Sequence, residues 1–351
     1  MACTEQVKVL LLIAALIGAL LISIGNAQTP PADTRSGASG GESSTLGEAR
    51  SLADTNHLPE AEDKDRRYLG TNPSSAEAHF LLGYILFRAI QAKASHEGRA
   101  DMRFEQQNAK ASLAEYTLGA KFKDPSAFDL WIVALDYVLL HDYVNADKWL
   151  TKSVELNPND SEAWYYLGRA RYNEERFQDA IPAFQKCLAL DPRNLKAEDN
   201  LGLSYAALNR RDDAVAAYQK AITWQANTLI KDSGPYIDLG TLLLDENRVE
   251  EAIGYLSQGA AISPEESRAH AELGKAYSKL NDFGKAQSEL EKAVQLAPDN
   301  GSLHYVLGQV YRKQGLVDRA KAEFDRSAEL NGSHSAPVND RPGPHDIQLS
   351  H

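Results

Sequence analysis

Residues 161–194 read SEAWYYLGRARYNEERFQDAIPAFQKCLALDPRN, and this stretch decides the fold of the chain. Its Leu-Gly pair recurs as Leu167-Gly168, Leu201-Gly202, Leu239-Gly240, Leu273-Gly274 and Leu307-Gly308. The intervals between successive pairs are equal, except that the second is longer. An alanine follows each of these glycines by twelve positions, and a large side chain follows each alanine by four. Recurrence at a fixed period indicates stacked copies of one structural unit rather than two or three ordinary domains.

The residue types at the fixed positions predict two packed helices in each copy. Small side chains at Gly168, Ala180 and Cys187 let helix backbones approach closely, and large ones such as Phe184 fill the remaining space. Pro192 ends the second helix, because proline cannot continue a helix. One such pair cannot bury its apolar face alone, so neighbouring copies must complete the core.

The pattern is similar to that of the tetratricopeptide-repeat (TPR) family, which reads W-x2-L-G-x2-Y, then A-x3-F-x2-A, then P, with a period of about 34 residues. Arg171 stands where the family has tyrosine, a common departure. The resemblance implies an all-α fold, a right-handed superhelical solenoid of antiparallel helix pairs (a TPR array). It also implies a non-catalytic protein-interaction scaffold that binds a peptide or a partner helix in its concave groove.

The repeat register predicts four segments: a signal peptide or N-terminal anchor over 1–27, a flexible linker over 28–41, the TPR array over 42–334 and a disordered tail over 335–351. The array divides into eight repeats, 42–75, 76–126, 127–160, 161–194, 195–232, 233–266, 267–300 and 301–334. The second repeat is enlarged, with its surplus around 92–107, which we interpret as lengthened helices. Linker and tail have too little apolar surface to offset the entropy of ordering.

The N-terminus predicts export. An apolar run over residues 9–24 follows Lys8, and Gly25 and Ala27 supply the small residues of a cleavage site before Gln28. Cleavage there gives a periplasmic or secreted protein. The alternative is an uncleaved anchor over residues 9–24, which would give a membrane-anchored structural or assembly factor. Membrane contact is expected only in that case.

Composition and motifs argue against several classes of function. The net charge is -12 and no basic stripe is visible, so we expect no nucleic-acid partner. The chain has no Gly-rich phosphate loop, no H-E-x-x-H and no G-x-S-x-G, so we expect neither an enzyme nor a cofactor. The nine histidines lack metal-ligand spacing, which favours structural or solvent roles. An enzyme could hide an unusual element only in the inserted stretch 92–107.

The resemblance places a ligand on the first helix of each repeat. Positions 2, 5, 6, 9, 12 and 13 face the groove in the family; here they are aromatic and apolar in repeats two to four, and polar with mixed charge in repeats five to eight. The candidate partner-binding residues are Tyr84, Phe87, Trp131, Leu135, Tyr165, Tyr166, Arg169, Tyr172, Asn173 and Asn200. Aromatic side chains with polar tips supply large contact areas at low entropic cost. The alternative is that they are core residues packed against neighbouring repeats.

A more specific ligand is excluded by the residues themselves. Some TPR domains clamp a C-terminal carboxylate with basic and amide side chains on three consecutive repeats. Here Tyr165, Gly234 and Asp238 stand where basic residues are needed, and Asp238 would repel a carboxylate. We therefore expect a protein or peptide ligand that is not held through a carboxylate clamp.

Overall fold

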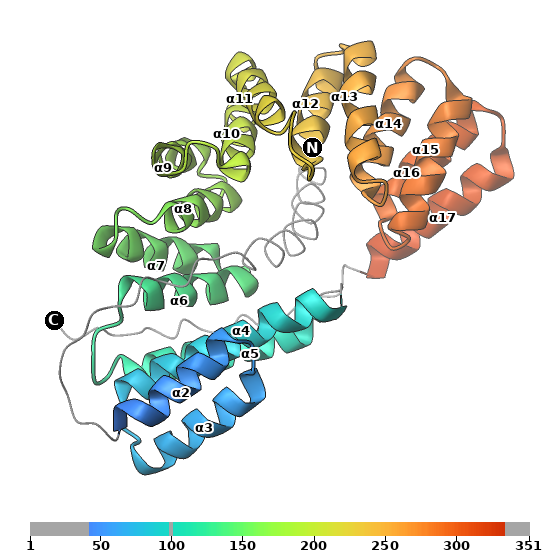
Figure 1. Cartoon of the computed structure of the whole chain (residues 1–351). Coiled ribbons are helices and arrows are strands. Elements are labelled where there is room, and N and C mark those ends of the chain that lie inside the picture. The colour runs from blue at the N-terminus through green and yellow to red at the C-terminus, as the bar shows by residue number, and fades with distance from the viewer. Residues whose placement is uncertain (1–41, 98–100, 334–351) are drawn as a thin grey trace. The chain divides into compact units, whose positions relative to one another are not determined.

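A computed structural model describes residues 42–97 and 101–333, which form sixteen α-helices and no strand (Figure 1). The predicted signal peptide or anchor (1–27), linker (28–41) and tail (335–351) lie outside the described residues. None of the helices described within 42–97 and 101–333 combines the length and hydropathy required to cross a bilayer. The described residues form two compact units, unit 1 over 42–176 and unit 2 over 177–333.

Unit 1 consists of consecutive helix pairs, in which we name the first helix A and the second helix B. Its helices are α2 (Glu42–Asp54), α3 (Leu58–Thr71), α4 (Ala76–Glu97), α5 (Met102–Gly119), α6 (Ala127–Leu139), α7 (Tyr143–Leu156) and the A helix α8 (Ser161–Asn173). Helices α4 and α5 have 22 and 18 residues, whereas the other helices of the unit have 13 or 14. The surplus of the enlarged second repeat therefore lies largely in extra helical turns.

Unit 2 begins with a B helix and continues with four pairs. Its helices are α9 (Phe177–Leu190), α10 (Leu195–Ala207), α11 (Arg211–Trp224), α12 (Gly234–Asp245), α13 (Val249–Ile262), α14 (Ser267–Lys279), α15 (Phe283–Leu296), α16 (Gly301–Lys313) and α17 (Val317–Ser333). The boundary between the units falls inside the predicted repeat 161–194, between its A and B helices. The surplus of repeat 195–232 forms part of the loop between α11 and α12.

Within each unit, neighbouring repeats meet mainly where the B helix of one repeat packs against the A helix of the next, and their A helices also touch. Helix α4 packs against both α2 and α6 in unit 1, and α10, α12, α14 and α16 pack in succession in unit 2. In unit 1 the B helices α3, α5 and α7 each pack against the A helix of their own repeat and the one that follows, and in unit 2 α11, α13 and α15 do the same. A helices that approach one another in this way line the concave side of a solenoid. The A-helix face is therefore where each unit offers an extended binding surface.

The turn between A and B helices uses one residue in the left-handed region, at the fifteenth position of every repeat except the enlarged second one. These residues are Asn56, His141, Glu175, Asn209, Asn247, Asn281 and Gly315, with φ between 57° and 79°. Asparagine and glycine adopt this conformation at low cost and end a helix there. At Asn281, for example, the next amide, that of Asp282, donates to the carbonyl of Tyr277 at 3.0 Å.

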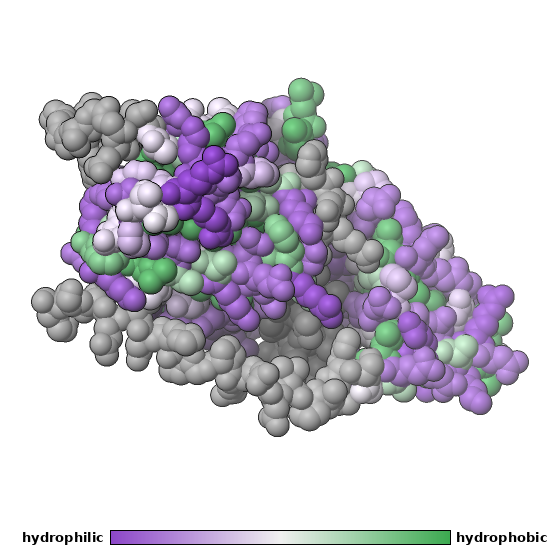
Figure 2. All heavy atoms as spheres, turned by 90° about the horizontal axis from the view of Figure 1, so that it is seen from below, coloured by the Kyte–Doolittle hydropathy of each residue, from purple (hydrophilic) through white to green (hydrophobic). Residues whose placement is uncertain are grey.

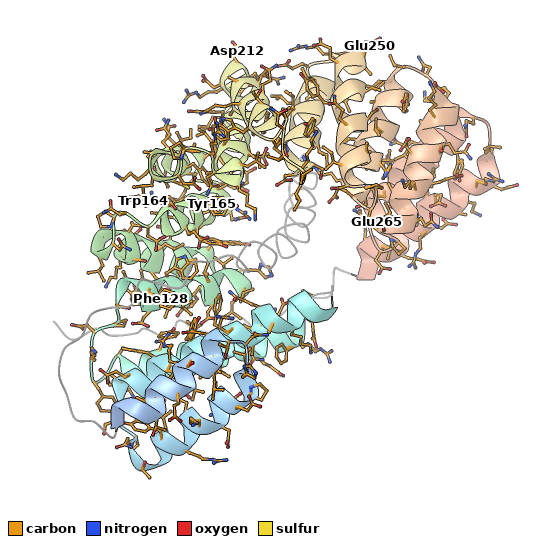
Figure 3. All side chains as sticks on the ribbon, in the orientation of Figure 1. Phe128, Trp164, Tyr165, Asp212, Glu250 and Glu265 are labelled. Carbon is orange, nitrogen blue, oxygen red and sulfur yellow. The ribbon has the colours of Figure 1, made fainter. Side chains whose placement is uncertain are left out.

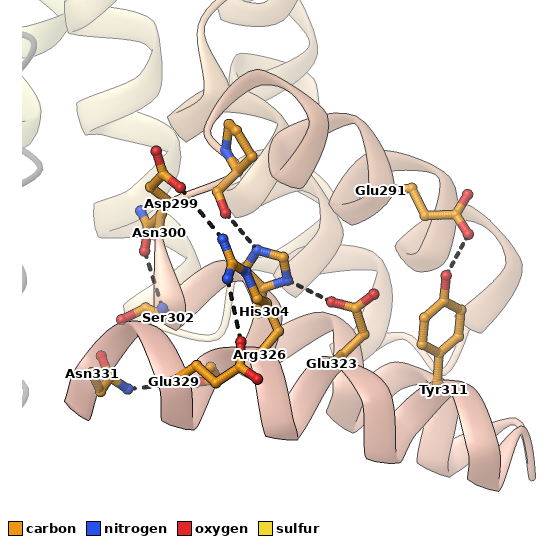
Figure 4. A network of polar contacts seen from close by, with 12 residues as sticks. Glu291, Asp299, Asn300, Ser302, His304, Tyr311, Glu323, Arg326, Glu329 and Asn331 are labelled. Carbon is orange, nitrogen blue, oxygen red and sulfur yellow. Dashed lines mark hydrogen bonds and ion pairs between the residues drawn. The ribbon is translucent and has the colours of Figure 1, made fainter. Parts of the chain in front are cut away.

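Three histidines hold the turn between successive repeats. His79, His270 and His304 occupy the fourth position of their repeats, where Trp164 stands in its own. Each Nε2 donates to the carbonyl of the proline six positions earlier, at 2.8–3.1 Å, as the Trp164 indole does to Pro158 at 2.9 Å. Each Nδ1 lies 2.6–2.7 Å from a carboxylate of the B helix, as Figure 4 shows for His304 and Glu323. The predicted structural role is observed for these three histidines.

The repeated glycines lie under large side chains of the B helix. A Cβ on Gly202 would lie 2.6 Å from Cε1 of Tyr218, and one on Gly240 would lie 2.6 Å from Cγ of Leu256. Real Cβ atoms do not approach so closely, so the helices can pack at this distance only with glycine at these positions. Gly254, in the exposed part of α13, has nothing within 4 Å of its Cβ position.

We therefore expect the same substitution at Gly202 and Gly254 to have opposite effects on stability. Gly202→Ala should lower the free energy of unfolding by about 1–3 kcal/mol, because Tyr218 must move. Gly254→Ala should raise it by up to about 1 kcal/mol, because alanine favours a helix over glycine. Urea unfolding followed by circular dichroism measures both. Equal shifts in one direction would show that Gly202 is not a packing constraint.

Candidate functional site

A continuous series of aromatic contacts crosses three successive A helices of unit 1. The ring of Tyr84 in α4 lies 5.7 Å from that of Phe128 in α6, and Phe128 lies 5.7 Å from Trp131. Trp131 then contacts Tyr166 in α8 at 6.2 Å, and Tyr166 contacts Tyr165 at 5.2 Å. Tilted and edge-to-face pairs at these separations are favourable beyond the area that they bury. We name these five residues the aromatic ladder.

Each end of the aromatic ladder carries a tyrosine bonded to an arginine one turn later. Arg88 donates from Nη1 to the Tyr84 hydroxyl at 2.9 Å, and Arg169 donates to the Tyr165 hydroxyl at 2.8 Å. Each guanidinium carbon also lies 5.7 Å from its ring centroid, a cation–π geometry. Arg50 of α2 adds a third guanidinium 5.0 Å from the Tyr84 ring. Three positive charges are thereby held in place beside an apolar surface.

The rings themselves are largely buried, whereas the groups beside them remain accessible. Tyr84, Trp131, Tyr165 and Tyr166 expose 4–8% of their surface. Partly exposed residues on the same A helices are Phe128, Arg88, Arg169, Tyr172 and Asn173. In Figure 3, Trp164 and Tyr165 leave α8 on different sides, so the indole that holds the proline turn lies away from the aromatic ladder. The accessible part of this surface therefore consists mainly of the arginines, Phe128, Tyr172 and Asn173.

Burial keeps the tyrosines of this surface protonated. Burial raises the pKa of Tyr84, and the Arg88 guanidinium opposes this effect without cancelling it. Burial also raises the pKa of Tyr166 far above its usual value, helped by Tyr165 and Glu162. These hydroxyls are therefore neutral at physiological pH and can both donate and accept; that of Tyr84 donates to Asp54 at 3.3 Å.

The predicted site residues fall into three groups. Nine of the ten lie on α4, α6 or α8 of unit 1, and Asn200 lies on α10 of unit 2, where its side chain donates to the Lys196 carbonyl at 2.8 Å. Phe87 and Leu135 expose 2% and 0% of their surface, so they pack in the interior of unit 1. The remaining seven belong to the aromatic ladder or to its periphery. Contact of any of them with a partner remains a prediction.

Two arginines of this surface were not among the candidate residues. Arg88 follows Tyr84 by four positions, as Arg169 follows Tyr165. Because residues four apart are neighbours on a helix, this shared Tyr-x3-Arg spacing could have predicted that Arg88 lies beside Tyr84. Arg50 had no such signal, because it reaches Tyr84 from a different helix.

One face of the molecule is mainly polar. In the face shown in Figure 2, hydrophilic side chains predominate and apolar ones form small separate patches. Within residues 42–97 and 101–333, no group of three or more His, Cys, Asp or Glu side chains is arranged to hold a metal ion. Cys187 is a buried cysteine of α9.

Comparison with known families decides which fold family these helix pairs represent. Four family models, each described as tetratricopeptide repeat, match residues 161–194, 46–89 with 272–334, 243–292 and 199–228. Together they match more than half of the chain. The chain belongs to the tetratricopeptide-repeat family. Helix-pair arrays of this kind present extended surfaces to protein partners, and this TPR protein is accordingly a protein-interaction scaffold.

Two solved structures, PilF and PilW, show the same fold at low sequence identity. PilF of Pseudomonas aeruginosa is 18% identical with a TM-score of 0.52, over 59% of this chain and 92% of PilF. PilW, described as a widely conserved type IV pilus biogenesis factor, is 16% identical with a TM-score of 0.52, over 60% of this chain and 94% of PilW. MamA is 24% identical with a TM-score of 0.42, over 48% of this chain and 96% of MamA. No curated protein matches the TPR chain.

Proposed function

We propose that this TPR protein is a non-catalytic adaptor that binds a peptide or a partner helix along the A-helix face of unit 1. The observation that carries the proposal is the aromatic ladder, which joins α4, α6 and α8 and is flanked at both ends by Tyr–Arg pairs. Its rings are fixed by one another, so little side-chain entropy is lost when a partner binds. A preorganised surface of this kind favours affinity.

The charges of the ladder indicate the chemistry of the partner segment. Arg88 and Arg169 are partly exposed and their guanidinium planes are oriented by tyrosine hydroxyls. A guanidinium in a fixed orientation recognises carboxylates and backbone carbonyls through paired N–H donors. The segment that fits therefore combines acidic or carbonyl groups with an apolar or aromatic side chain that contacts Phe128.

The test is affinity for a partner identified by crosslinking in the native host. We expect Arg88→Gln with Arg169→Gln to weaken the purified complex at least tenfold, because both oriented cations are lost. Arg66→Gln in α3 removes an equally charged, exposed arginine from outside the ladder and should change affinity less than twofold. Biolayer interferometry measures the affinities, and circular dichroism verifies the fold. If the folded double variant binds the partner as tightly as the wild-type protein, the partner does not bind on the A-helix face of unit 1.

We place this adaptor outside the cytoplasm, in the periplasm or in the secreted fraction. The support is the apolar run over residues 9–24 followed by the small-residue site before Gln28. The second candidate function is a membrane-anchored structural or assembly factor that retains residues 9–24. N-terminal sequencing of the mature protein separates the two, because a chain that starts at Gln28 has no such anchor.

A further inference from the structure

Three successive A helices of unit 2 bring together a cluster of charged side chains. Asp199 of α10 lies close enough to Asp238 of α12 for their carboxyl groups to interact, and Arg268 of α14 donates from Nη2 to Asp238. Asp199 and Asp238 expose 9% and 5% of their surface, while the Arg268 side chain exposes 31%. The cluster thus lies at the A-helix face of unit 2, with Arg268 at its exposed edge.

The cluster has more acceptors than donors. Arg268 donates to Asp238, and the Oδ1 atom of Asp199 is buried with no hydrogen-bond partner. Asp232, on the loop before α12, adds a third carboxylate nearby. Burial raises the pKa of Asp199 well above its usual value, and the carboxylates of Asp238 and Asp232 raise it further. Leaving a buried acceptor unsatisfied costs free energy, so one donor is missing at this position.

Gly234 lies directly beside two of these carboxylates. A Cβ on Gly234 would lie 3.3 Å from Oδ2 of Asp199 and 3.1 Å from Oδ1 of Asp232. The Gly234 amide donates to Asp232 at 2.8 Å, which orients that carboxylate along the same edge. A larger residue at position 234 would press on both acids, because Cβ contacts of 3.1 and 3.3 Å are tighter than most.

We propose that this cluster, named here the acidic position, binds the ammonium or guanidinium group of a lysine or arginine side chain of a partner protein. The proposal rests on the adaptor function proposed above and adds the chemistry that unit 2 selects. A cationic side chain brings several N–H donors, which supply the missing donor at Asp199 and balance the surplus negative charge. A bare metal ion is disfavoured, because within residues 42–97 and 101–333 no three His, Cys, Asp or Glu side chains are arranged to hold one.

Binding of the cation should release one proton. Asp199 in its neutral form has no charge with which to attract a cation. When the ligand cation arrives, the Asp199 O–H bond breaks, the proton passes to solvent and the carboxylate pairs with the ligand. The other titratable groups around it are Asp232 and Asp238 beside Asp199, and Glu272 and Tyr218 beside Arg268. Affinity should therefore rise with pH, by up to tenfold per pH unit for one released proton.

The experiment is an NMR titration of the full chain, labelled with ¹³C at the aspartate carboxyls, with the peptide acetyl-Gly-Ser-Lys-Ser-Gly-amide at pH 6 and pH 8. We expect the Asp199 carboxyl signal to move to its ionised position with the lysine peptide, and tighter binding at pH 8. The same peptide with glutamine in place of lysine should leave this signal unchanged. Asp199→Asn should weaken binding of the lysine peptide at least fivefold and abolish its pH dependence. Gly234→Ala should weaken binding, because the added methyl group displaces the carboxylates of Asp199 and Asp232.

The matched control is Asp245→Asn, which makes the same charge change at an exposed position of α12 and should alter binding less than twofold. Equal binding of the lysine and glutamine peptides would contradict the proposal that the acidic position binds a cationic side chain. Unchanged binding of the lysine peptide by Asp199→Asn would contradict it too. The proposal would also fail if the NMR signal of the Asp199 carboxyl stays at its protonated position when the lysine peptide is saturating. These outcomes leave the unit 1 adaptor intact, because Arg88→Gln with Arg169→Gln tests that surface separately.

Discussion

Replacing Tyr218 with alanine is expected to lower the free energy of unfolding by about 3–5 kcal/mol. Tyr218 of α11 exposes 1% of its surface and belongs to the core that α10 to α14 share. Its ring lies over Gly202, so no neighbouring side chain can move in to fill the cavity that its removal leaves. In a solenoid each repeat is stabilised mainly by its neighbours, so the cavity weakens both interfaces of this repeat. Urea unfolding followed by circular dichroism measures the loss.

The control for this prediction is another tyrosine of unit 2. Tyr305 of α16 exposes 51% of its surface and contacts Phe324 with its ring at 5.5 Å. Tyr305→Ala removes the same atoms from a mostly solvated site and should cost less than about 1 kcal/mol. Similar losses for the two variants would contradict the assignment of Tyr218 to the core.

Unit 1 should lose stability as the pH rises from about 4 to 7, because of one buried acid. Asp65 of α3 is fully buried, and neither carboxyl oxygen has a hydrogen-bond partner. Burial raises the pKa of Asp65 to about 7, with a further contribution from Glu115, while His79, Arg66 and Arg50 oppose it. The folded state therefore keeps this proton up to about pH 7, whereas the unfolded chain releases it near 3.8. Since the folded state binds more protons in that interval, stability falls as the pH rises.

Asp65→Asn should remove this dependence. The variant should match the wild-type protein near pH 3.5, where both states are protonated, and exceed its stability by about 2 kcal/mol at pH 8 after allowance for solvent screening. Asp63→Asn, on the exposed side of the same helix, makes the same change and should stay within about 0.5 kcal/mol at both values. Urea unfolding at the two pH values gives the comparison. A constant difference between wild type and Asp65→Asn would show that Asp65 does not titrate in this range.

The helix pairs could be read from the sequence because their signals are local and repeated. Small residues such as Gly202, large ones such as Tyr218 and the closing prolines recur in one register, and each has a steric reason to do so. The recurrence of asparagine at 209, 247 and 281 could also have predicted a left-handed turn there, but the turn was not among the expectations. The structural role of His79, His270 and His304 was expected, although their specific bonds to proline carbonyls were not.

The candidate site could be predicted only in outline. The Tyr165–Arg169 pair depends on one turn of helix and was expected to share a face. The burial of Phe87 and Leu135 depends on how neighbouring repeats pack, and helical spacing alone does not distinguish a surface from an interior at such positions. Arg50 reaches Tyr84 from the A helix of the preceding repeat, so no local pattern reports it.

The sequence by itself therefore determined the family, the period and the helical nature of the array, because glycine packing, helix capping and proline act within one repeat. Tertiary structure decided which aromatic rings join into the aromatic ladder and which stay accessible at its edges. It also decided that Asp199 meets Asp238 across two helices, although the two acids belong to different repeats and lie far apart in the chain. Pairing, burial and the resulting charge balance depend on side chains from different repeats, and only packing brings those side chains together.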